Sequence, residues 1–258
     1  IPGSLVGSEM CIRDRGKPTM KIQYRFDIEG NSLHYEVDVD RSFDFSAQRQ
    51  EVPEWAKLKH NQCPNCPLTV KDCQYCPAAV DLAAVVTDFQ RLPAQKTAKI
   101  RVVTPEREYA KETALEEGLR SLMGLIMATS ACPILTQLKP NARNHLPFAS
   151  QDDFIIRSTA LYLLKQYFNY RAGQRPDWEL QGLISLNQEL QTLNEAFWGR
   201  VKEACEGDSN LKALLSFLDM SSSVSYSLES QLQKVKPLMT DAEESPAIEV
   251  TTGEARLF

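Results

Sequence analysis

Apolar and polar residues alternate strictly along two runs near the beginning of the chain, and Gly30-Asn31 separates the two runs. Strict alternation is typical of strands that bury one face, and a Gly-Asn pair between such runs indicates a tight turn. The pattern therefore predicts a β-hairpin within residues 21–39. Its apolar positions are Ile22, Tyr24, Phe26, Ile28, Leu33, Tyr35, Val37 and Val39.

A second pair of strands is predicted at residues 99–104 and 107–110, with Pro105 close to the turn between them. Between the two pairs, residues 77–92 have the apolar spacing of a helix. Pro77 suits the first turn of that helix, because proline lacks the N–H group that this position leaves unpaired.

After residue 112, apolar residues recur every three or four positions, which is the spacing of an amphipathic helix. The apolar stripe of residues 178–205 favours the core of a bundle over a coiled coil, because its heptad pattern is short. A homodimer through the C-terminal helices is the alternative. Helices are predicted at residues 113–138, 151–170, 178–205 and 211–236.

These patterns predict an α+β protein, in which a small antiparallel β-sheet with a cysteine-rich insertion precedes a C-terminal α-helical bundle. The segment Leu5–Arg15 reads as the translation of a transposon end used in sequencing libraries, so the natural start is expected at Met20. The acidic, weakly apolar end of the chain is expected to be disordered. The four parts are upstream read-through (1–19), the α+β domain (20–112), the helical domain (113–239) and the acidic tail (240–258).

Composition narrows the class of protein. The chain is 43% hydrophobic, as in globular proteins, and its formal net charge of −5 argues against binding along a nucleic-acid backbone. The longest apolar stretch, Leu122–Leu135, is too short to span a bilayer, and we expect no signal peptide because no apolar run precedes a small-residue cleavage site. We therefore expect a cytoplasmic protein, in which thiols stay reduced and clustered cysteines serve metal or redox chemistry.

Four cysteines lie close together in two C-x-x-C pairs, Cys63 with Cys66 and Cys73 with Cys76. Two intervening residues let both sulfurs of a pair reach one ion, and Zn²⁺ accepts four thiolates in a tetrahedron. The spacing therefore predicts a zinc site. The alternatives are an iron–sulfur cluster, redox-active or disulfide-bonded cysteines, and His60 in place of one cysteine ligand.

Proline follows each pair, which favours Cys66 and Cys76 as N-cap residues with proline at the first helical position. A thiolate at a helix N-terminus is stabilised by the helix dipole. The isolated Cys132 lies in an apolar run and is expected to be buried and inert.

A second candidate site is the proline-rich stretch after residue 132 together with the start of the next predicted helix. Arg143, His145, Asp153 and Arg157 could bind an anion or transfer protons there. The interpretation that we favour is structural, with these residues capping helix ends and fixing the loop. No glycine-rich phosphate loop or known catalytic motif is present in the sequence, so an enzyme is the less favoured class.

The alternating hairpin, "CPNCPL", "CQYCPAA" and "CPILTQLKPNARNHLPFAS" before "RSTALYLLKQYF" together resemble an uncharacterised bacterial domain family of unknown function. The resemblance covers residues 20–170 and the helices that follow. It implies a bacterial cytosolic protein with a built-in cysteine site, and it implies no substrate. We therefore expect a metal-stabilised binding or regulatory module of unknown partner; the alternatives are a redox or iron–sulfur sensor and an enzyme working around Arg143 and His145.

Overall fold

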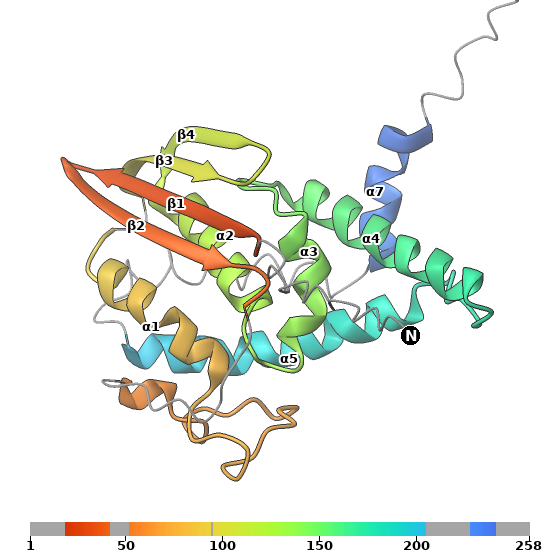
Figure 1. The fold of residues 1–258 in the computed structure, drawn as a ribbon, viewed down its shortest axis with the longest axis horizontal. Helices are drawn as coiled ribbons and strands as arrows, with labels where there is room; N and C mark the ends of the chain where they lie inside the picture. Colours follow the sequence, from red (N-terminus) through yellow and green to blue (C-terminus); the bar gives the residue numbers. More distant parts are fainter. Residues whose placement is uncertain (1–18, 42–51, 94, 205–227, 241–258) are drawn as a thin grey trace, which may run out of the picture.

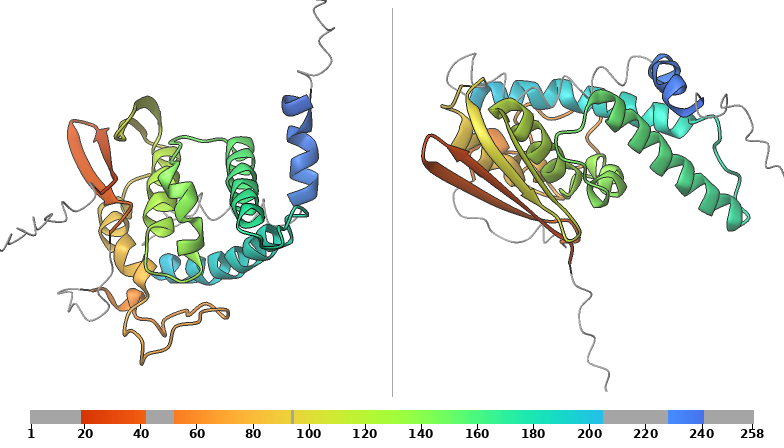
Figure 2. Two further views of the ribbon diagram at one scale, coloured as in Figure 1. Left: turned by 45° about the vertical axis from the view of Figure 1, so that its right-hand side comes forward. Right: turned by 90° about the horizontal axis from the view of Figure 1, so that it is seen from above.

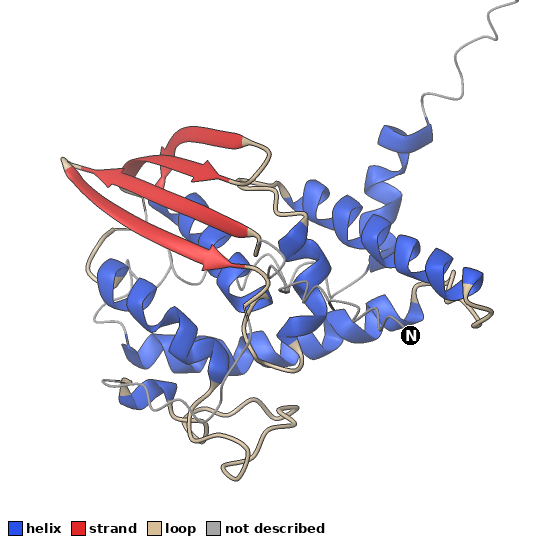
Figure 3. Cartoon of the chain, in the orientation of Figure 1, coloured by secondary structure: helices blue, strands red, loops and turns tan. Residues whose placement is uncertain are grey.

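The computed structural model describes residues 19–41, 52–93, 95–204 and 228–240. A four-stranded antiparallel sheet forms one side of the molecule, in the order β2-β1-β3-β4, and helices fill the other side (Figures 1 and 3). The protein is thus α+β, as predicted. The strands are β1 (Lys21–Ile28), β2 (Asn31–Asp38), β3 (Thr97–Val103) and β4 (Glu108–Ala114).

The predicted hairpin is confirmed, with its turn one residue earlier than the sequence indicated. Ile28 pairs with Asn31, which leaves Glu29 and Gly30 as the two turn residues. Both have positive φ, 49° and 85°, the conformation that two-residue hairpins require to match the twist of their strands. The apolar residues of β1 all face the helices and are buried.

Helices α1 (Pro77–Phe89) and α2 (Leu115–Ala128) pack on the buried face of the sheet (Figure 2). The rings of Phe26 on β1 and Phe89 on α1 meet edge to face, with centroids 5.2 Å apart. On α2, Gly118 lets the backbone approach the sheet so closely that a Cβ atom there would lie 2.2 Å from Cδ1 of Ile100.

The prediction of one helix over residues 113–138 is wrong in length, because α2 ends at Ala128. The Thr129 hydroxyl donates to the carbonyls of Leu125 and Ile126, which closes the last turn. Pro133 follows, and proline cannot continue a helical hydrogen-bond ladder. The chain then forms the 3-10 helix η2 (Leu135–Leu138) and the short α3 (Lys139–Arg143).

Two long helices complete the described fold, α4 (Gln151–Arg171) and α5 (Gln181–Ala204), and α7 (Leu228–Thr240) packs against α4. α5 runs along the side of the helical layer that faces away from the sheet (Figures 1 and 2). Of the helix predicted at 211–236, residues 211–227 lie outside the described residues. The apolar stripe of α5 is buried within the chain itself, as expected for a bundle core, at Leu183, Leu190, Leu193, Phe197 and Val201.

One hydrophobic cluster joins β1, α1, α2 and α5, from Ile22 to Val201. It crosses the boundary expected at residues 112 and 113, because α2 covers the sheet and α5 covers α1 and α2. Within the described ranges, every helix is too short or too polar to cross a bilayer. The expected parts 1–19 and 240–258 lie almost wholly outside the described residues.

Candidate functional site

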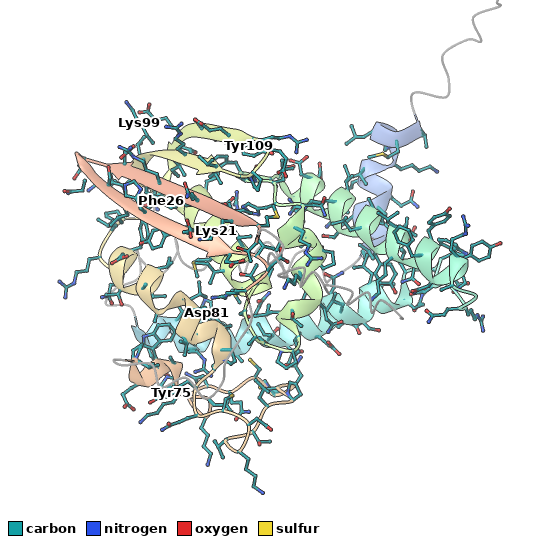
Figure 4. All side chains as sticks on the ribbon, in the orientation of Figure 1. Lys21, Phe26, Tyr75, Asp81, Lys99 and Tyr109 are labelled. Atoms are coloured by element: carbon teal, nitrogen blue, oxygen red, sulfur yellow. The ribbon has the colours of Figure 1, made fainter. Side chains whose placement is uncertain are left out.

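The four predicted cysteine ligands lie in a loop, residues 57–76, which we call the cysteine loop. Its two ends pair with each other, since Leu58 N–H donates to Gln74 O at 3.0 Å and Cys76 N–H to Ala56 O at 2.8 Å. The loop lies at the edge of the molecule away from the sheet; Tyr75 marks it in Figure 4, far from Phe26. The segment is thus a closed insertion between β2 and α1.

A buried arginine of α5 fixes the beginning of this loop. Arg200 is only 1% exposed, and its guanidinium donates to the carbonyl oxygens of Trp55 and Lys57, both at 2.6 Å. Longer hydrogen bonds reach Leu58 and Asn61, at 3.3 and 3.4 Å. Among the described residues no carboxylate pairs with Arg200, so a positive charge is buried beside the cysteine loop with only carbonyl partners.

Four cysteines from different parts of the chain line one small cavity of about 20 Å³, which we call the thiol cavity. Three come from the cysteine loop and the fourth, Cys132, comes from the turn after α2. Cys73 is buried but does not line the cavity; burial raises its pKa, and the neighbouring Cys76 and Cys66 add to the increase. The four lining cysteines are Cys63, Cys66, Cys76 and Cys132.

Cys132 lines the thiol cavity although it lies outside the two C-x-x-C pairs that predict the metal site. A signal for it is present in the sequence, because all four lining cysteines are followed by proline, whereas Cys73 is followed by glutamine. The expectation that Cys132 is buried is confirmed, at 7% exposed. The N–H groups of Leu135 and Ile134 also act on its sulfur.

Burial makes these thiols weak acids. It raises the pKa of Cys63 to about 12 and that of Cys132 to about 11, and it also raises the pKa of Cys73 and Cys76. The positive charge of Arg200 opposes the increase at Cys63 and Cys76. Without a bound cation these four thiols therefore keep their protons, and none of the described cysteines is in a disulfide.

The local geometry agrees only in part with a preformed metal centre. Cys76 is the N-cap of α1 with Pro77 at the first position, as predicted, whereas no helix follows Cys66. Nε2 of His60 lies 2.9 Å from Oε2 of Glu203, and His60 does not line the thiol cavity. As the side chains stand, no three His, Cys, Asp or Glu residues of the described ranges are close enough to share an ion.

The donor set still suits a soft cation in its chemistry, although the thiols are not yet close enough together to share one. Four sulfurs surround one apolar cavity whose wall exposes no polar surface, and sulfur donors are the preferred ligands of Zn²⁺ and of iron–sulfur clusters. Coordination would require the thiols to close around the cavity and to lose their protons. The buried charge of Arg200 would balance part of the resulting negative charge.

The structure separates the residues of the second candidate site. Arg143 donates to Oδ1 of Asp40 at 2.7 Å, on the surface. Asp153 forms the capping box of α4 with Ser150. His145 and Arg157, by contrast, line a cavity of about 90 Å³ between α2, α3, α4 and α5. A site around Arg143 therefore gains no support, while His145 and Arg157 share one cavity.

His145 lines this cavity and also connects two elements of the fold. Its Nε2 atom makes a short hydrogen bond with the hydroxyl of Tyr24 on β1. Burial, and secondarily the charge of Arg157, lower the pKa of His145 to about 3, while burial raises the pKa of Tyr24. Both side chains are therefore neutral near pH 7.

Comparison with known proteins gives one finding. Residues 20–240 match the family model DUF6901, described as a domain of unknown function. No curated protein and no solved structure matches the chain.

Proposed function

The chain belongs to the DUF6901 family, whose function is unknown, and we propose that its cysteine loop is a metal-stabilised binding or regulatory module, with zinc as the metal. The observation that carries this proposal is the convergence of Cys63, Cys66, Cys76 and Cys132 on one apolar cavity beside the buried Arg200. The proposal places the protein in the reducing cytoplasm, where these thiols stay available for metal.

The metal would act as a clasp between distant parts of the chain. Cys63 of the cysteine loop already contacts α5, with its Sγ 3.9 Å from the carbonyl oxygen of Leu193. Cys76 is the N-cap residue of α1. Cys132 follows α2. An ion held by these thiols would bind the cysteine loop to three helices at once, and the binding free energy of a structural zinc adds to folding stability. Loss of the metal would then release the loop from the helices. In the proposed module, this release would change the surface that a partner binds.

We assign Cys132, rather than Cys73, as the fourth ligand. Sequence spacing alone favours Cys73, but Cys73 does not line the thiol cavity and Cys132 does. The matched serine substitutions Cys73→Ser and Cys132→Ser therefore separate the two ligand sets. Cys132→Ser should lower bound zinc to the same extent as Cys63→Ser, while Cys73→Ser should leave most of the zinc in place.

The test is elemental analysis of the protein purified without oxygen, followed by hydrogen exchange before and after chelation. One zinc per chain, and faster exchange of residues 57–76 once zinc is removed, would support the proposal. Iron with a brown colour would replace it by the iron–sulfur alternative. Metal-free protein with a reversible disulfide among these cysteines would replace it by a thiol redox sensor. Loss of zinc in Cys73→Ser but not in Cys132→Ser would restore the ligand set that the sequence predicts.

A further inference from the structure

The cavity that contains His145 and Arg157 shares the wall residue Leu135 with the thiol cavity but has a different chemical character. Helices α2, α3, α4 and α5 and the loop after α3 form its wall, and its volume is about 90 Å³. An engineered cavity of about 150 Å³ accepts benzene, so this smaller one suits a molecule of no more than about six non-hydrogen atoms. We call it the polar cavity, because Arg120, Asn141, His145, Arg157, Asn187 and Asn194 contribute to its wall.

The wall contains hydrogen-bond donors that no group of the described residues uses. Asn194 is only 2% exposed, yet its Nδ2 atom has no partner, and the same is true of the buried Nε of Arg157. Buried polar groups in folded proteins almost always have partners. The amides of Asn141 and Asn187 are occupied by Ser158 and by the carbonyl of Leu183. The unused groups are therefore donors, which suit an acceptor.

The two arginines of this wall also lack carboxylate partners among the described residues. Arg120 makes no hydrogen bond there, and Arg157 only reaches the carbonyl of Asn144, at 3.3 Å. The carboxylates that act on them at longer range are held elsewhere. Glu117 pairs with Lys111 at 2.5 Å, and Asp153 caps α4. Two positive charges thus border the cavity without a negative charge in its wall.

We infer that the polar cavity binds a small organic anion, a carboxylate with a short apolar chain. Arg120 and Arg157 would hold the carboxylate oxygens, and the amide of Asn194 would donate a further hydrogen bond. His145 is neutral and carries no charge to the site. The lining of this cavity includes no residue of the cysteine loop, so a ligand held there would not contact the proposed metal.

The rest of the wall selects the carboxylate over an inorganic oxyanion. Most of the cavity surface is apolar, and phosphate there would leave several oxygens without donors. A short hydrocarbon chain, in contrast, has no polar atoms that would need hydrogen-bond partners from the wall. The apolar residues that face it include Leu125, Leu135, Leu138, Leu146, Phe154 and Leu190.

Calorimetric titration of the full chain with butyrate tests this inference. Butyramide, which has the same shape without the charge, and inorganic phosphate are the comparison probes. We expect one butyrate per chain, with butyramide and phosphate binding at least about tenfold more weakly. Arg120→Gln should weaken butyrate binding about tenfold or more, because this side chain would lose a charge-assisted hydrogen bond to the ligand and makes none within the described protein.

Two further variants keep the test decisive. Arg143→Gln changes an arginine that pairs with Asp40 outside the cavity, and it should bind butyrate like the parent. Asn194→Leu fills the site with an apolar group of similar size; it should melt at least as high as the parent and no longer bind butyrate. Absent butyrate binding, equal binding of butyramide, binding of phosphate alone, or equal weakening by Arg143→Gln would each overturn the inference.

Discussion

At the scale of single residues, buried polar side chains mark the features that distinguish this protein. Arg200 donates hydrogen bonds to backbone carbonyls at the start of the cysteine loop. His145 connects the loop after α3 to the sheet through its hydrogen bond with Tyr24. Each is buried in a setting where an ordinary protein would place an apolar residue. Their effects on stability can therefore be separated from those of the surrounding core.

His145 should make stability depend on pH. Its folded pKa of about 3 lies below the ordinary value of 6.5, so between these values the unfolded chain binds a proton that the folded chain excludes. The free energy of unfolding should therefore fall by about 1.4 kcal/mol per pH unit between about pH 6 and 4 from this residue alone. Tyr24, whose pKa is raised, and Arg157 face His145 and do not change charge in that range; Arg120 is the other basic side chain of its cavity.

Chemical denaturation of the parent and of His145→Gln across this pH range measures the effect. The difference in unfolding free energy between the two proteins should shrink as the pH falls, because the variant lacks the linkage. His34→Gln, at an exposed position on β2, is the matched control and should follow the parent. Parallel pH profiles of the parent and His145→Gln would show that His145 is protonated in the folded state as well.

Replacing Arg200 should loosen the cysteine loop. Arg200→Met leaves the carbonyls of Trp55 and Lys57 without their donor in a buried place, which should cost about 3 kcal/mol of unfolding free energy. Lys202→Met, two residues along α5 at an exposed position over Trp198, should cost less than about 1 kcal/mol. Denaturant titration gives both values, and hydrogen exchange should rise at residues 57–76 in the first variant only. Similar losses in the two variants would remove Arg200 from this role.

At the scale of elements, α2 packs against the sheet through a close approach of its backbone at Gly118, whereas α5 is less tightly packed at Gly199. A Cβ atom at Gly118 would overlap with Ile100 and with Phe26, both in the core. At Gly199 of α5 the nearest atom, Cγ of Asn61, would lie at an ordinary contact distance of 3.6 Å. The two helical glycines therefore have different roles despite the same backbone conformation.

Alanine substitution at these two glycines should have opposite effects. Gly118→Ala should lower the free energy of unfolding by about 1–3 kcal/mol, because α2 or its neighbours must shift to avoid the overlap. Gly199→Ala should raise it by about 0.5–1 kcal/mol, because alanine favours the helix and meets no obstacle. Thermal and urea melts of the pair provide the comparison. Stabilisation by Gly118→Ala would mean that α2 does not lie this close to β1 and β3.

At the scale of the whole molecule, a single core unites parts of the chain that are far apart in sequence. Sheet residues such as Ile100 are covered by α2, and α1 and α2 are in turn covered by α5, so that neither half has a complete core of its own. The cysteine loop adds a second connection, through Arg200 to α5.

The chain should therefore unfold as one unit. Calorimetry of the full chain should give one transition with equal calorimetric and van't Hoff enthalpies. The isolated segment 20–112 lacks α2 and α5 and should show no cooperative melting, because the apolar face of its sheet would be exposed to water. Two separate transitions, or cooperative melting of the isolated segment, would instead indicate two domains that fold independently.

The sequence by itself determined the local structure. Alternation defined the hairpin, proline after cysteine defined the start of α1, and the capping pair Ser150 and Asp153 defined the start of α4. These features depend on interactions within a few residues, so they can be read directly from residue order. The early end of α2 was missed because an apolar run continues past Ala128, although Pro133 was present as a local signal.

Only the tertiary structure decided which distant side chains meet. Arg143 and His145 are neighbours in the sequence, yet one pairs with Asp40 on the surface and the other is buried against Tyr24. Cys132 reaches the cysteine loop from the turn after α2, and Arg200 reaches it from α5, at separations that no local spacing encodes. Such contacts depend on how the helices pack on one another and on which side chains the shared core buries. The local sequence pattern around two distant residues is therefore almost the same whether they form a site or remain apart.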